Sequence, residues 1–243
     1  PMNAAPEAGP VPPTAALDTA FAALARYDRG SGRGALQPID DAVAAATQDA
    51  ALRAALETRL VTVLRGPASA VAREFACEKL ARIGGPDAVP ALAALLADPD
   101  LAHAAAHALR AIPGEAASHA LRQSLGRLSG LPLLGAIAAL GQRRDVASVA
   151  ALAGFLGHAE ARVATAAAAA LGEIGSVAAA RELQTFLTRA PQAIRPALAD
   201  ACLVCAEHLR QTGETRAARR LLDALLGTAP APHVRAAALR LLA

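Results

Sequence analysis

Aromatic residues are scarce in this sequence. Phenylalanine, tyrosine and tryptophan make up 2% of the 243 residues, with four phenylalanines, one tyrosine and no tryptophan. Proteins that bind single-stranded nucleic acid stack the bases on aromatic side chains, so this scarcity argues against that class. Strands are enriched in aromatic and β-branched residues, whereas alanine and leucine, which are abundant here, favour helices. The composition therefore predicts an all-α protein.

Lysine is nearly absent as well. Lys79 is the only lysine, so arginine carries most of the positive charge, and the formal net charge is only +3 because 21 acidic residues accompany the basic ones. A nucleic-acid-binding protein typically shows a concentrated basic stripe, so we expect no nucleic-acid partner. No run of 18 uncharged apolar residues occurs, which predicts no membrane span.

Two leucine registers repeat together along the chain. Leu109, Leu140, Leu171 and Cys202 are spaced by 31 residues, and Leu80 precedes the first by 29. The second register consists of Leu96, Leu125, Leu156, Leu187 and Leu226. A period of this length, with two markers in step, is typical of stacked helical pairs in a solenoid.

The repeats divide the chain into three parts. Residues 1–13 are Pro-rich and are interpreted as a tail or linker. Residues 14–66 are expected to form a divergent first repeat or helical cap. Residues 67–243 are expected to form a regular array that ends in a half repeat. Glycines after the first helices of the pairs, at 84–85, 175 and 213, are predicted to end those helices with positive φ angles.

The unit at residues 71–100, VAREFACEKLARIGGPDAVPALAALLADPD, carries a family resemblance. It resembles a HEAT repeat of the short type named after phycobilisome lyases, in which a Val-Arg helix ends at Leu-Gly-x-Ile-Gly and is followed by Ala-Val-Pro-x-Leu. The resemblance implies a right-handed α-solenoid of about five to six helical pairs, whose second helices line the concave surface.

The leucine register also predicts which side chains of the second helices are exposed. A helix that buries positions 0, −1, −4 and −7 relative to the register leucine leaves positions −6 and −3 on the opposite face. Position −6 is Pro90, His119, Ala150, Arg181 and Arg220, and position −3 is Ala93, Arg122, Ala153, Gln184 and Asp223. We therefore predict a partner-binding surface formed by His119, Arg122, Arg181, Gln184, Arg220 and Asp223. The alternative is that these residues are only a solvated helix face.

Metal and redox sites are weakly indicated. Cys202 and Cys205 form a CxxC motif, but it lies within a helix, whereas redox motifs require a helix N-terminus. Together with His208 they are one ligand short of a structural zinc site, so we interpret both cysteines as core residues. His103 and His107 share a helix face, but two histidines alone do not complete a metal site.

No catalytic motif is present, and the sequence predicts neither an enzyme nor a cofactor. We expect a non-enzymatic scaffold that binds a protein partner on the concave face. The alternative that the resemblance implies is a bilin lyase or another chromophore-handling protein. The half repeat at residues 232–243 exposes apolar positions, which is consistent with a module of a longer chain, a self-associating array or a terminal cap.

Overall fold

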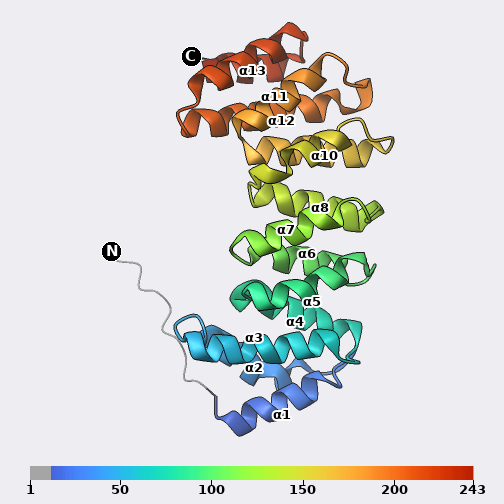
Figure 1. Ribbon diagram of the computed structural model, residues 1–243, viewed down its shortest axis with the longest axis vertical. Helices are drawn as coiled ribbons and strands as arrows, with labels where there is room; N and C mark the ends of the chain where they lie inside the picture. Colours follow the sequence, from blue (N-terminus) through green and yellow to red (C-terminus); the bar gives the residue numbers. More distant parts are fainter. Residues whose placement is uncertain (1–11, 243) are drawn as a thin grey trace. The chain divides into compact units, whose positions relative to one another are not determined.

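The computed structural model describes residues 12–242, and these form helices and loops with no strand among them (Figure 1). The all-α class and the solenoid arrangement of helical pairs are therefore confirmed. The predicted Pro-rich tail, residues 1–13, lies almost entirely outside the described residues.

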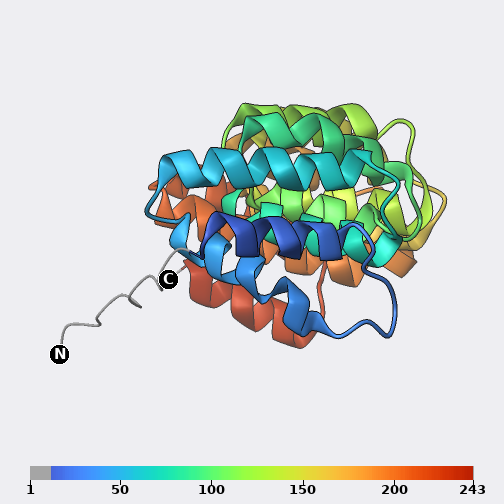
Figure 2. The same ribbon diagram turned by 90° about the horizontal axis from the view of Figure 1, so that it is seen from below.

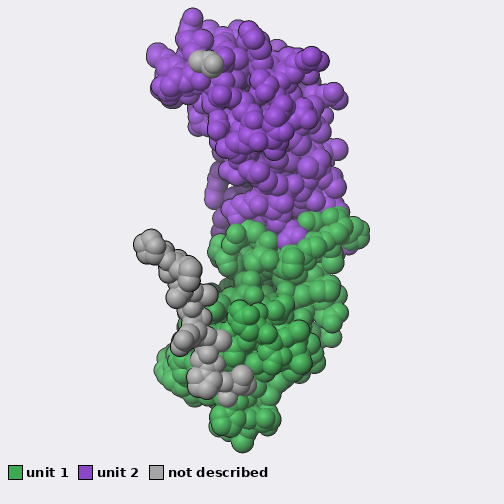
Figure 3. Space-filling view, turned by 90° about the vertical axis from the view of Figure 1, so that its left-hand side faces the viewer, with its two compact units in different colours: residues 1–120 green, residues 121–243 purple. Residues whose placement is uncertain are grey.

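The chain forms two compact units, which meet in sequence between Ala120 and Leu121 (Figure 3). Unit 1 contains α1 (Thr14–Leu24), η1 (Arg33–Leu36), α2 (Gln37–Ala45), α3 (Ala50–Arg65), α4 (Ala70–Ile83), η2 (Pro86–Ala88), α5 (Val89–Ala94), η3 (Leu95–Ala97) and α6 (Ala102–Ala111). Helix α7 (Glu115–Ser124) spans the division. Unit 2 contains α8 (Gly130–Gln142), η4 (Val146–Ser148), α9 (Val149–Phe155), α10 (Ala161–Ile174), α11 (Val177–Leu187), η5 (Gln192–Ile194), α12 (Arg195–Gln211), α13 (Thr215–Gly227) and α14 (Pro232–Leu242).

Each unit has a layer of first helices and a layer of second helices. In unit 2 the first helices α8, α10 and α12 pack side by side, and the second helices α9, α11 and α13 do the same. In unit 1 the corresponding layers contain α2, α4 and α6, and α3 and α5. Helix α1 packs on α2 (Figure 2). Arg59 of α3 stacks on Phe21 of α1, 4.1 Å from the ring centroid, and pairs with Asp18 at 2.8 Å.

The first leucine register is buried in full. Leu80, Leu109, Leu140, Leu171 and Cys202 are all 0% exposed. The second register holds through Leu187, but its prediction at Leu226 is wrong. Leu225 is the buried residue of α13, at 1% exposure, because the longer last unit shifts the register by one position. The face of α13 is accordingly rotated relative to the sequence-based expectation.

The first helices of unit 2 approach one another closely at small residues. A Cβ atom added at Gly141 would lie 2.7 Å from the Cα atom of Ala170, and one added at Gly172 would lie 2.8 Å from the carbonyl oxygen of Ala201. Both the glycines and the alanines are spaced by 31 residues, the repeat period. The contact α8–α10 is thus repeated as α10–α12, with backbone against backbone.

The glycines after the first helices end them in two different ways. Gly175 adopts the predicted left-handed conformation, with φ at 59°. Gly84 does not, since its φ is −64°, so the prediction of a positive φ is wrong there. Glycine at position 84 is instead required by space, because an added Cβ atom would lie 2.5 Å from the carbonyl oxygen of Leu80.

A buried carboxylate links two successive repeats of unit 1. Glu57 of α3 is 8% exposed, and its Oε1 atom accepts hydrogen bonds from the backbone N–H groups of Gly85 and Ala88, each at 2.9 Å. It therefore satisfies the N-terminal donors of η2, a helix start that has no capping side chain of its own.

Within residues 12–242, no helix is both long enough and apolar enough to cross a membrane.

The close contact in unit 2 can be tested by a glycine substitution and a matched control. Replacing Gly172 with alanine should lower the free energy of unfolding by about 1 to 2 kcal/mol, because overpacking against the Ala201 backbone outweighs the gain in helix propensity. The control is Gly154 in α9, where an added Cβ atom meets nothing within 4 Å. Gly154→Ala should raise stability by up to about 1 kcal/mol. Urea denaturation followed by circular dichroism measures both changes, and equal effects of the two substitutions would contradict the close packing.

Candidate functional site

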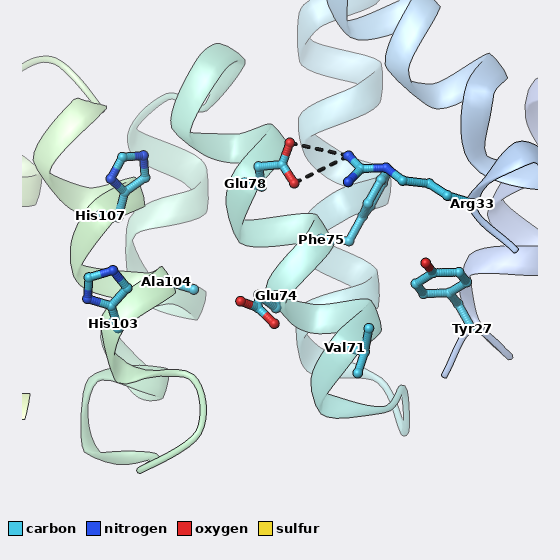
Figure 4. A pocket seen from close by; sticks show the side chains of 9 residues that line it. All are labelled: Tyr27, Arg33, Val71, Glu74, Phe75, Glu78, His103, Ala104 and His107. Atoms are coloured by element: carbon cyan, nitrogen blue, oxygen red, sulfur yellow. Dashed lines mark hydrogen bonds and ion pairs between the residues drawn. The ribbon is translucent and has the colours of Figure 1, made fainter. Parts of the chain in front are cut away.

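A cleft of about 480 Å³ opens on the first-helix side of unit 1 (Figure 4). We call it the unit 1 cleft. It is lined by Tyr27, Arg33, Val71, Glu74, Phe75, Glu78, His103, Ala104 and His107. Helix α4 forms its floor, α6 contributes the histidine wall, and the loop after α1 together with η1 contributes the opposite wall.

A serine side chain fixes the loop wall of the unit 1 cleft. The Ser69 hydroxyl caps α4 by accepting a hydrogen bond from the backbone N–H of Ala72 at 3.1 Å. The same hydroxyl donates to the carbonyl oxygen of Tyr27 at 2.5 Å. One side chain therefore joins the start of α4, the floor of the cleft, to the loop wall that carries the tyrosine.

The only lysine of the chain lies beneath the unit 1 cleft. Lys79 is 2% exposed, and its ammonium group pairs with Asp40 at 2.5 Å and with Glu78 at 2.7 Å. It also lies over the ring of Phe75, 4.5 Å from the centroid. A buried cation is tolerated only when it is paired, and here two carboxylates and an aromatic face surround it.

Arg33 joins the same network from the loop side. Its Nη2 atom lies 3.4 Å from both carboxylate oxygens of Glu78, and its Nε atom lies 3.8 Å from Asp40. The guanidinium carbon is 5.2 Å from the centroid of the Phe75 ring. The network thus ties η1 to α4 and holds the loop wall against the floor of the cleft.

Two groups of the unit 1 cleft have shifted pKa values. Burial alone raises the pKa of Glu78, but the hydrogen bond and charge of Lys79 and the charge of Arg33 outweigh it and leave that pKa lowered. The pKa of His107 is lowered by burial and by the charges of Arg110 and His103, which favours its neutral form. Its Nδ1 atom lies 3.0 Å from a guanidinium nitrogen of Arg110.

The sequence contained a signal for this cleft that its leucine registers did not reveal. Glu74 and His103 are 29 residues apart, as are Glu78 and His107, and 29 is also the spacing from Leu80 to Leu109. The two carboxylates and the two imidazoles therefore occupy equivalent positions on successive first helices. Figure 4 shows them on neighbouring helices, α4 and α6, along the same cleft.

A second, smaller groove of about 280 Å³ lies between α11 and α13 in unit 2. We call it the unit 2 groove, and it is lined by Val177, Ala180, Arg181, Gln184, Ala217 and Arg220. Three of the six residues predicted to bind a partner, Arg181, Gln184 and Arg220, meet here. All three are exposed, and within residues 12–242 neither arginine forms an ion pair.

The other three predicted residues lie elsewhere. Arg122 donates two hydrogen bonds, at 2.7 and 2.8 Å, to the carboxylate of Asp145, whose side chain is only 6% exposed. Its guanidinium group therefore stabilises a buried acid. Asp223 lies 4.0 Å from Arg219 one turn away on α13. His119 is exposed on the part of α7 that belongs to unit 1.

The cysteines are core residues, as predicted. Cys202 and Cys205 are 0% exposed, and burial raises the pKa of Cys205 to about 12, which keeps it a thiol. Burial raises the pKa of Cys202 as well, with a further contribution from Cys205. Among the described residues, no three histidine, cysteine, aspartate or glutamate side chains are placed to hold a metal ion, including those around His103 and His107.

The fold and its surface grooves define an α-solenoid repeat protein. Residues 56–128 match the family model of HEAT repeats, so the HEAT-repeat resemblance is confirmed over that stretch. A comparison with curated protein sequences finds no match.

Several solved structures are similar to the chain at low identity. Human deoxyhypusine hydroxylase in complex with glycerol is 20% identical, with 79% of this chain and 96% of that chain covered and a TM-score of 0.40. An engineered protein is 22% identical, with coverages of 76% and 94% and a TM-score of 0.46. The complex of CpcE and CpcF of phycocyanin lyase from Nostoc sp. PCC7120 is 20% identical, with coverages of 99% and 97% and a TM-score of 0.45. These values are too low to transfer an activity from any of the three proteins to this chain.

The buried ion network predicts strong coupling between Lys79 and Asp40. Asp40→Asn should lower the free energy of unfolding by about 2 kcal/mol, because Lys79 then remains a buried cation with only Glu78 as an acidic partner. Adding Lys79→Met removes that cation, so the double variant should be more stable than the sum of the single effects predicts, by about 1 kcal/mol or more. Urea denaturation of the two single variants and the double variant measures this double-mutant cycle.

Asp18→Asn, which breaks an exposed ion pair, is the control and should lower the free energy of unfolding by less than about 1 kcal/mol. Additive effects at Asp40 and Lys79 would contradict the coupling.

Proposed function

We propose that this chain is a non-enzymatic scaffold that binds a protein partner on the second-helix layer of unit 2, centred on the unit 2 groove. The observation that carries the proposal is the convergence of Arg181, Gln184 and Arg220. They come from two different repeats, and they line one groove. Repeat arrays of stacked helices present extended surfaces of this kind to partners.

The character of the unit 2 groove favours a protein partner over a small molecule. Its volume of about 280 Å³ lies at the lower limit of small-ligand sites, which typically measure about 300 to 1,000 Å³. Its floor consists of the short side chains of Val177, Ala180 and Ala217, and its described lining includes no aromatic residue on which a bilin would stack. Arg181 and Arg220 remain available to carboxylates of a partner, because neither pairs with another residue in the described chain.

Site-specific photo-crosslinking tests this proposal. A photoreactive amino acid at Gln184 should give a discrete crosslinked protein in cells that produce the chain natively. The matched position is Glu173, which is exposed on the first helix α10 of the same unit and should give no such adduct. Introducing Arg181→Glu and Arg220→Glu beside the probe at Gln184 should reduce the adduct at least about fivefold, since the reversed charges repel a partner's carboxylates.

The charge reversal needs a control of equal net charge. Arg162 and Arg210 are exposed on α10 and α12, so Arg162→Glu with Arg210→Glu changes the charge of unit 2 equally on the first-helix layer. This variant should leave the adduct at Gln184 intact. Equal crosslinking at positions 184 and 173, or an adduct that withstands the reversal of Arg181 and Arg220, would overturn the proposal.

A further inference from the structure

The unit 1 cleft gathers residue types that the rest of the chain nearly lacks. Its lining includes the only tyrosine, Tyr27, one of four phenylalanines, Phe75, and two of six histidines. The only lysine lies directly below it. Elsewhere phenylalanine and histidine are used singly, as at the buried Phe186 and at His208, whose Nδ1 atom lies 3.3 Å from the carbonyl oxygen of Gly172. Within residues 12–242, this cleft is where tyrosine, phenylalanine, histidine and carboxylate side chains line one surface.

One guanidinium group is already bound in the unit 1 cleft, that of Arg33. The aromatic ring of Phe75 lies under it. The carboxylate of Glu78 is one turn further along α4, and both of its oxygens lie 3.4 Å from the Nη2 atom of Arg33. This combination suits a guanidinium group, which is planar, stacks on aromatic faces and pairs with carboxylates along its edge. The chain itself thus shows which chemistry this surface accommodates.

One carboxylate of the unit 1 cleft has no cationic partner among the described residues. Arg33 and Lys79 are both engaged with Asp40 and Glu78. Glu74 is exposed and forms no ion pair with another residue in the range 12–242. Its carboxylate therefore remains accessible to a charged ligand.

We propose that the unit 1 cleft binds a second guanidinium group, supplied by a ligand, at the carboxylate of Glu74. Figure 4 shows Glu74 between the two walls, with His103 on the α6 side and Tyr27 on the loop side. The carboxylate accepts two parallel hydrogen bonds from the guanidinium edge. The short side chains of Val71 and Ala104 line the same cleft and contact the apolar stem of the ligand.

The size and composition of the cleft support this ligand class. A volume of about 480 Å³ lies within the range of small-ligand sites, about 300 to 1,000 Å³, and exceeds what a single guanidinium group needs. An anionic ligand is disfavoured, because Arg33 and Lys79 are already paired with carboxylates. A metal ion is disfavoured, because no set of three suitable ligands exists among residues 12–242. Two kinds of ligand carry such a guanidinium group: a free small molecule and a peptide with an arginine side chain.

Tyrosine fluorescence reports on the cleft selectively, since Tyr27 is the only tyrosine and tryptophan is absent. The purified full chain is titrated with N-acetyl-arginine amide as the free ligand and with acetyl-Leu-Arg-Leu amide as the peptide. The matched analogues contain citrulline, which has the same shape without the charge. We expect saturable binding of at least one arginine compound, confirmed by calorimetry, and binding of its citrulline analogue at least about fivefold weaker.

Glu74→Gln should weaken binding of the arginine compound roughly five- to tenfold, as expected for the loss of one accessible charge-assisted pair. Glu173→Gln, an exposed residue of α10, removes the same charge elsewhere and should change nothing. Circular dichroism verifies that both variants are folded. Saturation by the free compound identifies a small-molecule site, and saturation by the peptide alone identifies a peptide site.

Absence of saturation with both arginine compounds, in fluorescence and in calorimetry, would overturn the inference. Equal binding of arginine and citrulline, or binding unaffected by Glu74→Gln, would do so as well. The outcome is independent of the proposed scaffold role, because crosslinking at Gln184 in unit 2 does not involve Glu74.

Discussion

The repeat array of unit 2 depends on backbone-to-backbone contact between successive first helices. At Gly141 and Gly172 the facing alanine backbones leave no room for a Cβ atom. Dispersion attraction falls off steeply with distance, so this close approach gives each helix many contacts without large side chains. A core of alanine and leucine is sufficient only because the helices are this close. Between the first helices of unit 2, large aromatic side chains are therefore unnecessary.

Close packing also determines where functional side chains can lie. The first helices bury their small-residue faces against one another, and the second helices bury their leucines, so the remaining positions are exposed in rows that repeat with the array. The unit 2 groove arises where two such rows meet between α11 and α13. The unit 1 cleft arises where η1 is held against α4 by the ion network around Lys79. One site follows from the repeat, and the other from a local departure from it.

The parts of the fold that follow from periodicity could be predicted from the sequence. Leu80 to Leu171 mark the buried face because a repeated contact requires a repeated residue. The prediction was wrong at Leu226, where a longer unit breaks the period and Leu225 is buried instead. The ion pair of Arg122 could not be predicted either, because its partner Asp145 lies in the following repeat, and charge partners across loops leave no periodic signal. The position of Tyr27 beside the start of α4 depends on the Ser69 hydrogen bond, which sequence spacing does not indicate.

The burial of Lys79 has a chemical consequence for the whole folded chain. Its amine is 2% exposed and is the single ε-amino group in the sequence. Acylating reagents and enzymes that modify lysine act on an accessible, unprotonated amine, and here access requires that α4 separate from α2. Lysine acetylation or conjugation would therefore mark local opening of unit 1, and the folded array would be inert to it.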